Sequence, residues 1–176
     1  MLFRSFDDNG RAITPHDLLT HAAALPDGAL FPADAAVRYR ATAAPGTFFH
    51  YCNMGYEALG LLLAHLDGGS LADSFRRRLL VPLGMLATEP VILPAMAGKV
   101  ATAYTARYSD RPLPRFGELA RAPAMAFTSA AGCVAAPARD MGAYLTMLIR
   151  RGEGPKGRVV SPEGFAKFME IGRAHV

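Results

Sequence analysis

Apolar residues recur at helical spacing between Met54 and Asp67. The leucines of this segment fall at the i, i+3, i+4 and i+7 positions of one helical face, namely Leu59, Leu62, Leu63 and Leu66. Gly68 and Gly69 follow directly, and glycine commonly ends a helix because it adopts the left-handed conformation without steric cost. The pattern predicts a helix over residues 54–67 with its leucine face buried.

A capping pattern begins an earlier helix. Thr14 and Asp17 have the spacing of a capping box, in which each side chain bonds the backbone of the other residue, and Pro15 suits the first turn. The segment DLLTHAAAL is predicted to continue this helix as far as the turn signal PDG at 26–28. Residues 29–47 show little periodicity and are predicted to form a surface loop.

Ser70 and Asp73 repeat the capping-box spacing and predict the start of another helix. We expect this helix to turn its arginines outward and to end before Pro82, because proline cannot donate the next backbone hydrogen bond. Its predicted buried positions are Leu71, Phe75 and Leu79.

The second half of the chain is less regular. Residues 86–128 are rich in proline and glycine and are expected to hold at most short strands, while GCVAAP at 132–137 favours a short extended piece. A helix is predicted from about Ala138 to Arg151, and a last one begins near Ser161. The inward positions of the first of these two helices are predicted to be Met141, Leu145 and Leu148.

The composition indicates one globular domain. The 176 residues suffice for a single core, and 51% hydrophobic against 19% charged residues is typical of a folded chain. No apolar stretch approaches the roughly 20 residues that a membrane-spanning helix needs. The formal net charge is +4, and we interpret its densest basic run, residues 76–78, as a solvated helix face rather than a nucleic-acid contact.

Histidines and cysteines show no metal-binding pattern. His16 and His21 are five positions apart, so on a helix they point about 140° apart and cannot share an ion. Cys52 and Cys133 are too few for a disulfide framework, although one bond between them stays open. We expect neither a metal nor a cofactor.

Four polar residues have both a chemical and a structural interpretation. Cys52 near His50 permits a thiol hydrolase, but this spacing leaves no room for an orienting third group and favours a small buried cysteine. His21 suits a general base or, preferably, a donor to the carbonyls at a helix C-terminus. Asp140 and Arg139 are interpreted as an acid matched to a helix N-terminus and a surface base.

Tyr51 and Asn53 stand at the entrance of the leucine-rich helix. In an extended segment residues two apart point the same way, so this phenol and this carboxamide would line one surface. An unperturbed phenol has a pKa of about 10 and serves as a base at neutral pH only beside a cation such as lysine. Taken alone, the pair also fits a helix N-cap at Asn53 and a packed ring at Tyr51.

Five segments occur in an order that resembles the serine β-lactamase-related family: ITPHDLLTHAAALPD, PGTFFHYCNMGYEALG, PLGMLAT, VATAY and SAAGCVAAPARDMGAYL. This family comprises class C β-lactamases, penicillin-binding DD-peptidases and related esterases. The resemblance spans about residues 13–169. It implies an α+β fold of the β-lactamase/transpeptidase type, of which this chain carries mainly the α-helical lobe and its loops.

The resemblance implies a serine hydrolase that works through an acyl-enzyme. Residues 51–53 match the family's second motif, Tyr-x-Asn, so Tyr51 is implied to be the catalytic acid and base, its pKa lowered by a lysine. Asn53 is implied to bind that lysine and the substrate amide. The implied partner is a small-molecule or peptide substrate (a β-lactam, a D-amino peptide or an ester), the implied location is periplasmic or extracellular, and the oligomeric state stays open.

The chain departs from the family at its first and third motifs. None of Lys99, Lys156 and Lys167 has a serine three positions before it, and neither Lys-Thr-Gly nor His-x-Gly occurs. The family carries these motifs upstream and downstream of the segments found here, so we expect both ends to be cut. We therefore predict a partial domain over residues 1–170 and a non-native tail over 171–176, whose sequence IGRAHV is what one frame of a common sequencing adapter encodes.

A function of another class stays open on these observations. A non-catalytic relative would bind peptidoglycan-like peptides or serve as an interaction domain on the same fold. A Ser-x-x-Lys motif upstream of LLTH in the complete reading frame would favour the enzyme, and its absence there would favour the binding domain.

Overall fold

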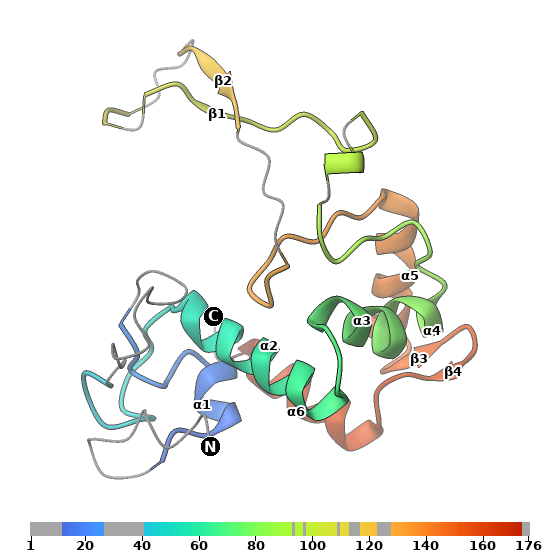
Figure 1. Ribbon diagram of the computed structural model, residues 1–176. Coiled ribbons are helices and arrows are strands. Elements are labelled where there is room, and N and C mark those ends of the chain that lie inside the picture. Colours follow the sequence, from blue (N-terminus) through green and yellow to red (C-terminus); the bar gives the residue numbers. More distant parts are fainter. Residues whose placement is uncertain are drawn as a thin grey trace.

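In the computed structural model the helices lie together, and the hairpin of β1 and β2 stands apart from them (Figure 1). The largely helical content with small sheets agrees with the α-helical lobe that the resemblance implies. The structure describes residues 12–26, 41–92, 94–96, 98–108, 110–112, 117–122 and 128–173. Its helices and strands are α1 (Pro15–Leu19), α2 (Asn53–Asp67), α3 (Leu71–Phe75), η2 (Arg76–Leu80), α4 (Val81–Leu83), η3 (Pro94–Met96), β1 (Tyr104–Ala106), β2 (Leu119–Arg121), α5 (Ala138–Ile149), β3 (Glu153–Gly154), β4 (Gly157–Arg158) and α6 (Pro162–Arg173).

The capping box at the start of α1 is confirmed. The backbone N–H of Asp17 donates to Thr14 Oγ1 at 3.3 Å, and the Thr14 N–H donates to Asp17 Oδ2 at 2.8 Å. The helix nevertheless ends at Leu19, so the longer helix that the sequence predicts is wrong. His21 and Ala24 have φ angles of 55° and 53°, in the left-handed region where a right-handed helix cannot continue.

Pairing with a distant segment accounts for this early end. The Thr42 N–H donates to the Ala24 carbonyl at 2.8 Å, and the Gly46 N–H donates to the Ala22 carbonyl at 2.7 Å. These carbonyls therefore bond another part of the chain instead of the next helical turn. The hydrophobic periodicity of one segment does not indicate that a distant segment will bond its carbonyls. Most of the loop predicted over 29–47 lies outside the described residues.

α2 confirms the predicted helix and ends at Gly68, whose φ of 67° is left-handed. Its buried face differs from the predicted leucine face, because Leu66 is 72% exposed. The buried residues of this helix are Met54, Gly55, Glu57 and Gly60.

Small residues determine which face of α2 is buried. A Cβ atom on Gly60 would lie 2.6 Å from the Cβ of Ala130, and one on Gly55 would lie 3.4 Å from the Leu18 carbonyl oxygen. Because glycine has no side chain, α1 and the segment around Ala130 can approach the helix backbone closely. The glycines thus occupy the place in the interface that the periodicity predicts for the leucines.

α3, η2 and α4 form one continuous helical run that begins at the predicted cap, Ser70. Pro82 lies within α4, so the predicted stop before it is wrong. η2 is π-helical, and this wider turn directly precedes the proline, which lacks a backbone donor and would crowd a regular turn. The run ends at Gly84, whose φ is 72°.

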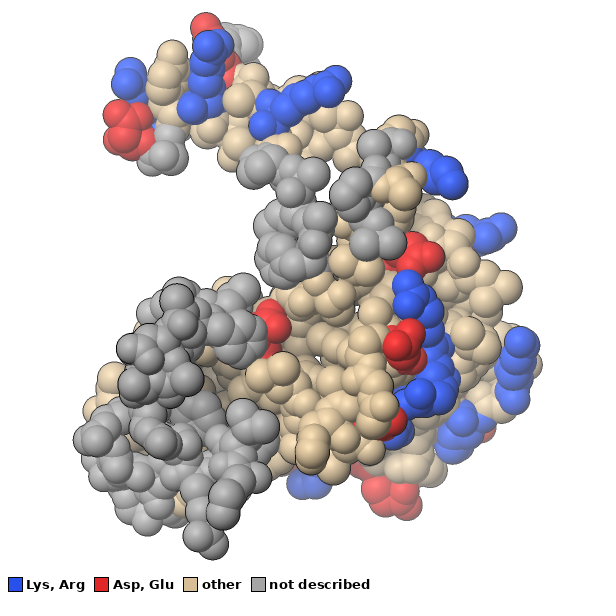
Figure 2. Space-filling view, viewed as in Figure 1, with Lys and Arg blue, Asp and Glu red and all other residues tan. Residues whose placement is uncertain are grey.

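The arginines of η2 form ion pairs at the surface. Arg77 lies 2.9 Å from Asp67, Arg78 pairs with the same carboxylate, and Arg76 lies 2.7 Å from Glu89. The hydrogen bond from Arg78 holds the pKa of Asp67 below its usual range. In the view of Figure 2, basic and acidic side chains alternate along one side of the molecule. This agrees with the predicted solvated surface.

α5 confirms the predicted helix, but part of its predicted inward face is wrong. Met141 and Leu145 are 40% and 53% exposed, whereas Met147 is buried. Asp140 sets this orientation at the first turn, where its buried carboxylate accepts hydrogen bonds from the Ala87 N–H at 3.0 Å and the Thr88 hydroxyl at 2.9 Å. Residues at i+4 and i+7 from Asp140 then face inward with it.

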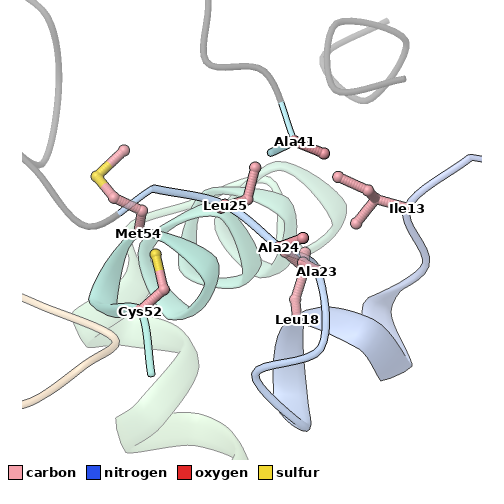
Figure 3. Close-up of a cluster of buried hydrophobic side chains, with 8 residues drawn as sticks. All are labelled: Ile13, Leu18, Ala23, Ala24, Leu25, Ala41, Cys52 and Met54. Atoms are coloured by element: carbon pink, nitrogen blue, oxygen red, sulfur yellow. The ribbon is translucent and has the colours of Figure 1, made fainter. Parts of the chain in front are cut away.

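Two clusters of buried apolar side chains form the core. The first joins α1, the start of α2 and the segments beside them (Figure 3) and consists of Ile13, Leu18, Ala23, Ala24, Leu25, Ala41, Cys52 and Met54. The second joins the end of η2 with α4 and α5 and consists of Leu80, Leu83, Met85 and Met147.

The remaining described segments hold only short pairings. The predicted extended piece at 132–137 is confirmed only in part: Glu89 and Ala135 exchange two backbone hydrogen bonds of 2.9 Å, whereas Cys133 has a left-handed φ of 63°. The sequence does not predict the hairpin of β3 and β4 after α5; Gly157, the first residue of β4, has a φ of 118°. Within the described residues, no helix has the length and apolar character needed to cross a membrane.

Candidate active site

Tyr51, Cys52 and Asn53 lie at the N-terminus of α2. Cys52 has extended backbone angles and is the N-cap, and Asn53 is the first helical residue, so an N-cap role for Asn53 is wrong. The Cys52 side chain is buried and its thiol lies 3.5 Å from the Pro26 carbonyl oxygen. Tyr51 is 57% exposed, so it is not a packed core ring, and its phenol faces the surface beside a fixed helix end.

His21 binds the backbone on both sides of Tyr51. The Cys52 N–H donates to His21 Nδ1 at 3.1 Å, and the His50 N–H donates to the His21 carbonyl at 2.8 Å. An acceptor nitrogen on imidazole carries no proton, so Nδ1 is occupied and is not available as a base. The bond to Cys52 also replaces the helix-terminal role that the sequence favours for this histidine.

Aromatic rings surround the His21 imidazole. Its centroid lies 4.5 Å from the Tyr51 ring and 5.1 Å from the Tyr56 ring, both tilted, and 5.7 Å from Phe49 in an edge-on contact. The Tyr56 hydroxyl donates to the Leu19 carbonyl at 3.0 Å. Burial, and then the proximity of Tyr51, raises the pKa of Tyr56 above its usual range, so Tyr56 stays a neutral hydrogen-bond donor.

A second polar group lies on the same face of α2 as Asn53. Glu57 follows Asn53 by one helical turn and is buried. Its Oε1 accepts a short hydrogen bond from the Ser129 hydroxyl, and the Ser129 oxygen accepts the Ala131 N–H at 3.0 Å. The sequence does not predict this pair, because the two residues come from segments with no shared pattern.

The other candidates from the sequence have structural surroundings. Burial alone would raise the pKa of Asp140, but the hydrogen bonds from Thr88 and the Ala87 N–H outweigh it and lower that pKa, while Arg139 lies 3.5 Å away at the surface. Asp140 therefore has a structural role in the first turn of α5, where it binds residues 87–88, a contact that the predicted helix-dipole role does not include. Within the described part of the chain no three His, Cys, Asp or Glu side chains gather to hold a metal. Cys52 and Cys133 are free thiols.

The sequence matches the family model described as Beta-lactamase over residues 4–168. None of the curated proteins matches the chain.

Solved structures share this fold. An octameric penicillin-binding protein homologue from Pyrococcus abyssi has 26% sequence identity and a TM-score of 0.71, with 94% of this chain and 40% of that one covered. The D-amino acid amidase from Ochrobactrum anthropi SV3, complexed with L-phenylalanine amide, has 23% identity and a TM-score of 0.56, with 78% and 43% covered. EstCE1, a hydrolase with promiscuous acyltransferase activity, has 21% identity and a TM-score of 0.61, with 88% and 49% covered. The chain thus spans less than half the length of each of these proteins.

Proposed function

Because the chain belongs to the Beta-lactamase family, we propose that it is part of a serine hydrolase that acts through an acyl-enzyme on a β-lactam, a D-amino peptide or an ester. The family match confirms the resemblance drawn from the five sequence segments. A penicillin-binding protein homologue, an amidase and an acyl-transferring hydrolase among the structures with this fold support acyl-transfer chemistry. The observation that carries the proposal is the exposed Tyr51 phenol beside Asn53 at the start of α2.

Tyr51 has the proposed role of general acid and base, and Asn53 that of a hydrogen-bonding partner for the substrate amide. A free phenol holds its proton at neutral pH, so Tyr51 needs a cation beside it in the complete site. The family resemblance assigns that cation to the lysine of Ser-x-x-Lys, whose serine is the nucleophile. The chain contains no Ser-x-x-Lys motif. The proposed activity is therefore that of a complete protein that includes this motif, here called the full-length protein.

Replacing Tyr51 with phenylalanine tests the proposed role directly. In the full-length protein, Tyr51→Phe removes one hydroxyl and keeps the ring, so we expect kcat to fall roughly 10²- to 10⁴-fold, the usual contribution of a positioned acid or base. Because the ring is exposed, the melting temperature should hardly change. Hydrolysis of a chromogenic β-lactam, a D-amino acid amide and a short-chain ester would be measured for both proteins.

Cys52→Ser is the matched control at the neighbouring position. Its thiol is buried and faces the Pro26 carbonyl, so we expect turnover within a few-fold of the unchanged protein. Near-normal turnover of Tyr51→Phe together with loss of activity in Cys52→Ser would reject the tyrosine role in favour of a thiol enzyme.

The chain without the Ser-x-x-Lys motif should form no acyl-enzyme, because binding groups without a nucleophile give no covalent intermediate. We expect no labelled band after incubation with a fluorescent penicillin or a fluorophosphonate probe and a denaturing gel. A specific, stoichiometric band would contradict this expectation. If the full-length protein also stays unlabelled, the rival role as a non-catalytic peptide-binding or interaction domain gains support.

A further inference from the structure

His21 is bonded to the backbone immediately before and immediately after Tyr51. Its carbonyl accepts the His50 N–H at 2.8 Å, and its Nδ1 accepts the Cys52 N–H at 3.1 Å. We propose that His21 is a positioning residue that fixes the direction of the Tyr51 phenol. This inference rests on the proposed function, because it assigns His21 a role that is exerted through the proposed acid and base.

The bond from Cys52 depends on the His21 side chain itself. The bond from His50 goes to a carbonyl, which any residue would supply, whereas Nδ1 is an acceptor that most side chains lack. The backbone φ of His21 is 55°, and few residues other than glycine adopt this conformation readily, with asparagine, aspartate and histidine enriched among them. Position 21 thus demands a side chain that tolerates a left-handed backbone and also offers an acceptor.

The imidazole also limits the freedom of the phenol ring. Its centroid lies 4.5 Å from that of Tyr51, which is contact distance for two tilted rings. His21 is buried, whereas the Tyr51 ring is more than half exposed. The buried imidazole therefore packs against one side of the exposed phenol ring, and the exposed side is left for reacting groups.

Positioning of this kind affects turnover more than substrate affinity. A general base acts only within hydrogen-bond reach of the proton that it takes, and a displacement of about 1 Å can cost about 100-fold in rate. Loss of the Nδ1 bond frees the backbone at Cys52 and therefore the direction of the neighbouring phenol. The effect should appear in kcat, with KM nearly unchanged.

Two variants of the full-length protein separate the acceptor from the backbone conformation. His21→Gly tolerates the positive φ but removes both the acceptor and the ring, and we expect kcat to fall about 10- to 100-fold with KM within about threefold. His21→Asn also tolerates the positive φ and places an amide oxygen where it can accept the Cys52 N–H, so it should recover most of kcat. Kinetics would be measured well below the melting temperature of each variant, so that lost stability does not lower the active fraction.

A double-mutant cycle with Tyr51→Phe identifies the path of the effect. If His21 acts through the phenol, His21→Gly should cost almost nothing once Tyr51 is already phenylalanine. Equal losses in both backgrounds, or a His21→Asn variant as slow as His21→Gly, would overturn the inference. A large effect of Tyr51→Phe with none of His21→Gly would overturn the positioning role alone. No effect of Tyr51→Phe would reject the proposed function, and with it the role inferred for His21.

Discussion

Glu57 and Cys133 are a pair of residues whose electrostatic coupling can be measured. Burial raises the pKa of the Cys133 thiol, and the negative charge of Glu57 raises it further. Glu57 is itself buried on α2, and the Ser129 hydroxyl donates to its carboxylate. The charge of this carboxylate on α2 thus changes the pKa of a thiol in the segment that packs on the helix.

Glu57→Gln should lower the pKa of Cys133 in the full-length protein. Glutamine keeps the shape and an acceptor for Ser129 but removes the charge, so the thiolate forms at lower pH, while burial still holds its pKa above the ordinary value. Because the thiolate is the reactive form, alkylation of Cys133 by iodoacetamide should accelerate at a fixed mildly alkaline pH. Mass spectrometry of the Cys133 peptide across a pH series gives the midpoint.

Glu118→Gln is the control for this titration. Glu118 is an exposed carboxylate that pairs with Arg107 at 2.7 Å on the β1–β2 hairpin, so its loss should leave the Cys133 midpoint unchanged. Identical midpoints for Glu57→Gln and the unchanged protein would mean that burial alone determines this thiol pKa.

Short capping patterns predict one helix start and one helix end that the structure confirms. The capping box at Thr14 and the helix end at Gly68 depend on residues within four positions of each other, and both are confirmed. The bond between His21 and Cys52 joins residues 31 positions apart, and no short pattern encodes it. The order of the five segments indicates the Tyr-x-Asn motif, whereas only the structure shows the histidine that binds its backbone.

At the scale of elements, glycines rather than leucines determine how α2 packs. Gly60 lies against Ala130, and Gly55 lies against α1. Hydrophobic periodicity predicts the existence and length of α2, because apolar residues at i, i+3, i+4 and i+7 favour a helix. It does not predict the buried face, because two backbones approach closely only where a residue such as glycine has no side chain.

Gly60→Ala and Gly142→Ala should have opposite effects on stability. A Cβ on Gly60 would lie 2.6 Å from the Ala130 Cβ, so overpacking should cost about 1–3 kcal/mol of unfolding free energy, more than the gain in helix propensity. Gly142 lies in α5 with nothing within 4 Å of an added Cβ, so alanine there should gain about 0.5–1 kcal/mol. Urea unfolding of the full-length protein would measure both, and a stabilised Gly60→Ala would contradict the close packing.

At the scale of the whole molecule, α5 and α6 leave apolar surface uncovered. Met141, Leu145 and Ile149 form an exposed stripe along α5, and Ile149 is 82% exposed. A groove with a cavity volume of about 700 Å³ lies between α5 and α6 and is lined in part by Leu148, Ile149, Phe165 and Met169. Contiguous apolar surface of this kind drives association in water.

The 176-residue chain should therefore bind a hydrophobic dye and elute as a large assembly in size-exclusion chromatography with light scattering. The double variant Leu145→Glu with Ile149→Glu should reduce both signals, because it places two charges in the exposed stripe. Leu66→Glu changes a leucine of similar exposure on another helix and should have a smaller effect. A sharp monomer peak with a cooperative thermal transition for the unchanged chain would contradict this expectation.

The bonds between Ala24 and Thr42 have a consequence for how the chain length can vary. The Thr42 N–H and hydroxyl both donate to the Ala24 carbonyl, at 2.8 and 3.0 Å, so these bonds hold together two residues that are 18 positions apart. The closure entropy of a chain segment whose two ends are held together grows slowly with its length, by about 0.6 kcal/mol per doubling. Insertions and deletions between these two residues should therefore be common among relatives, while the spacing from Thr42 to Tyr51 stays constant.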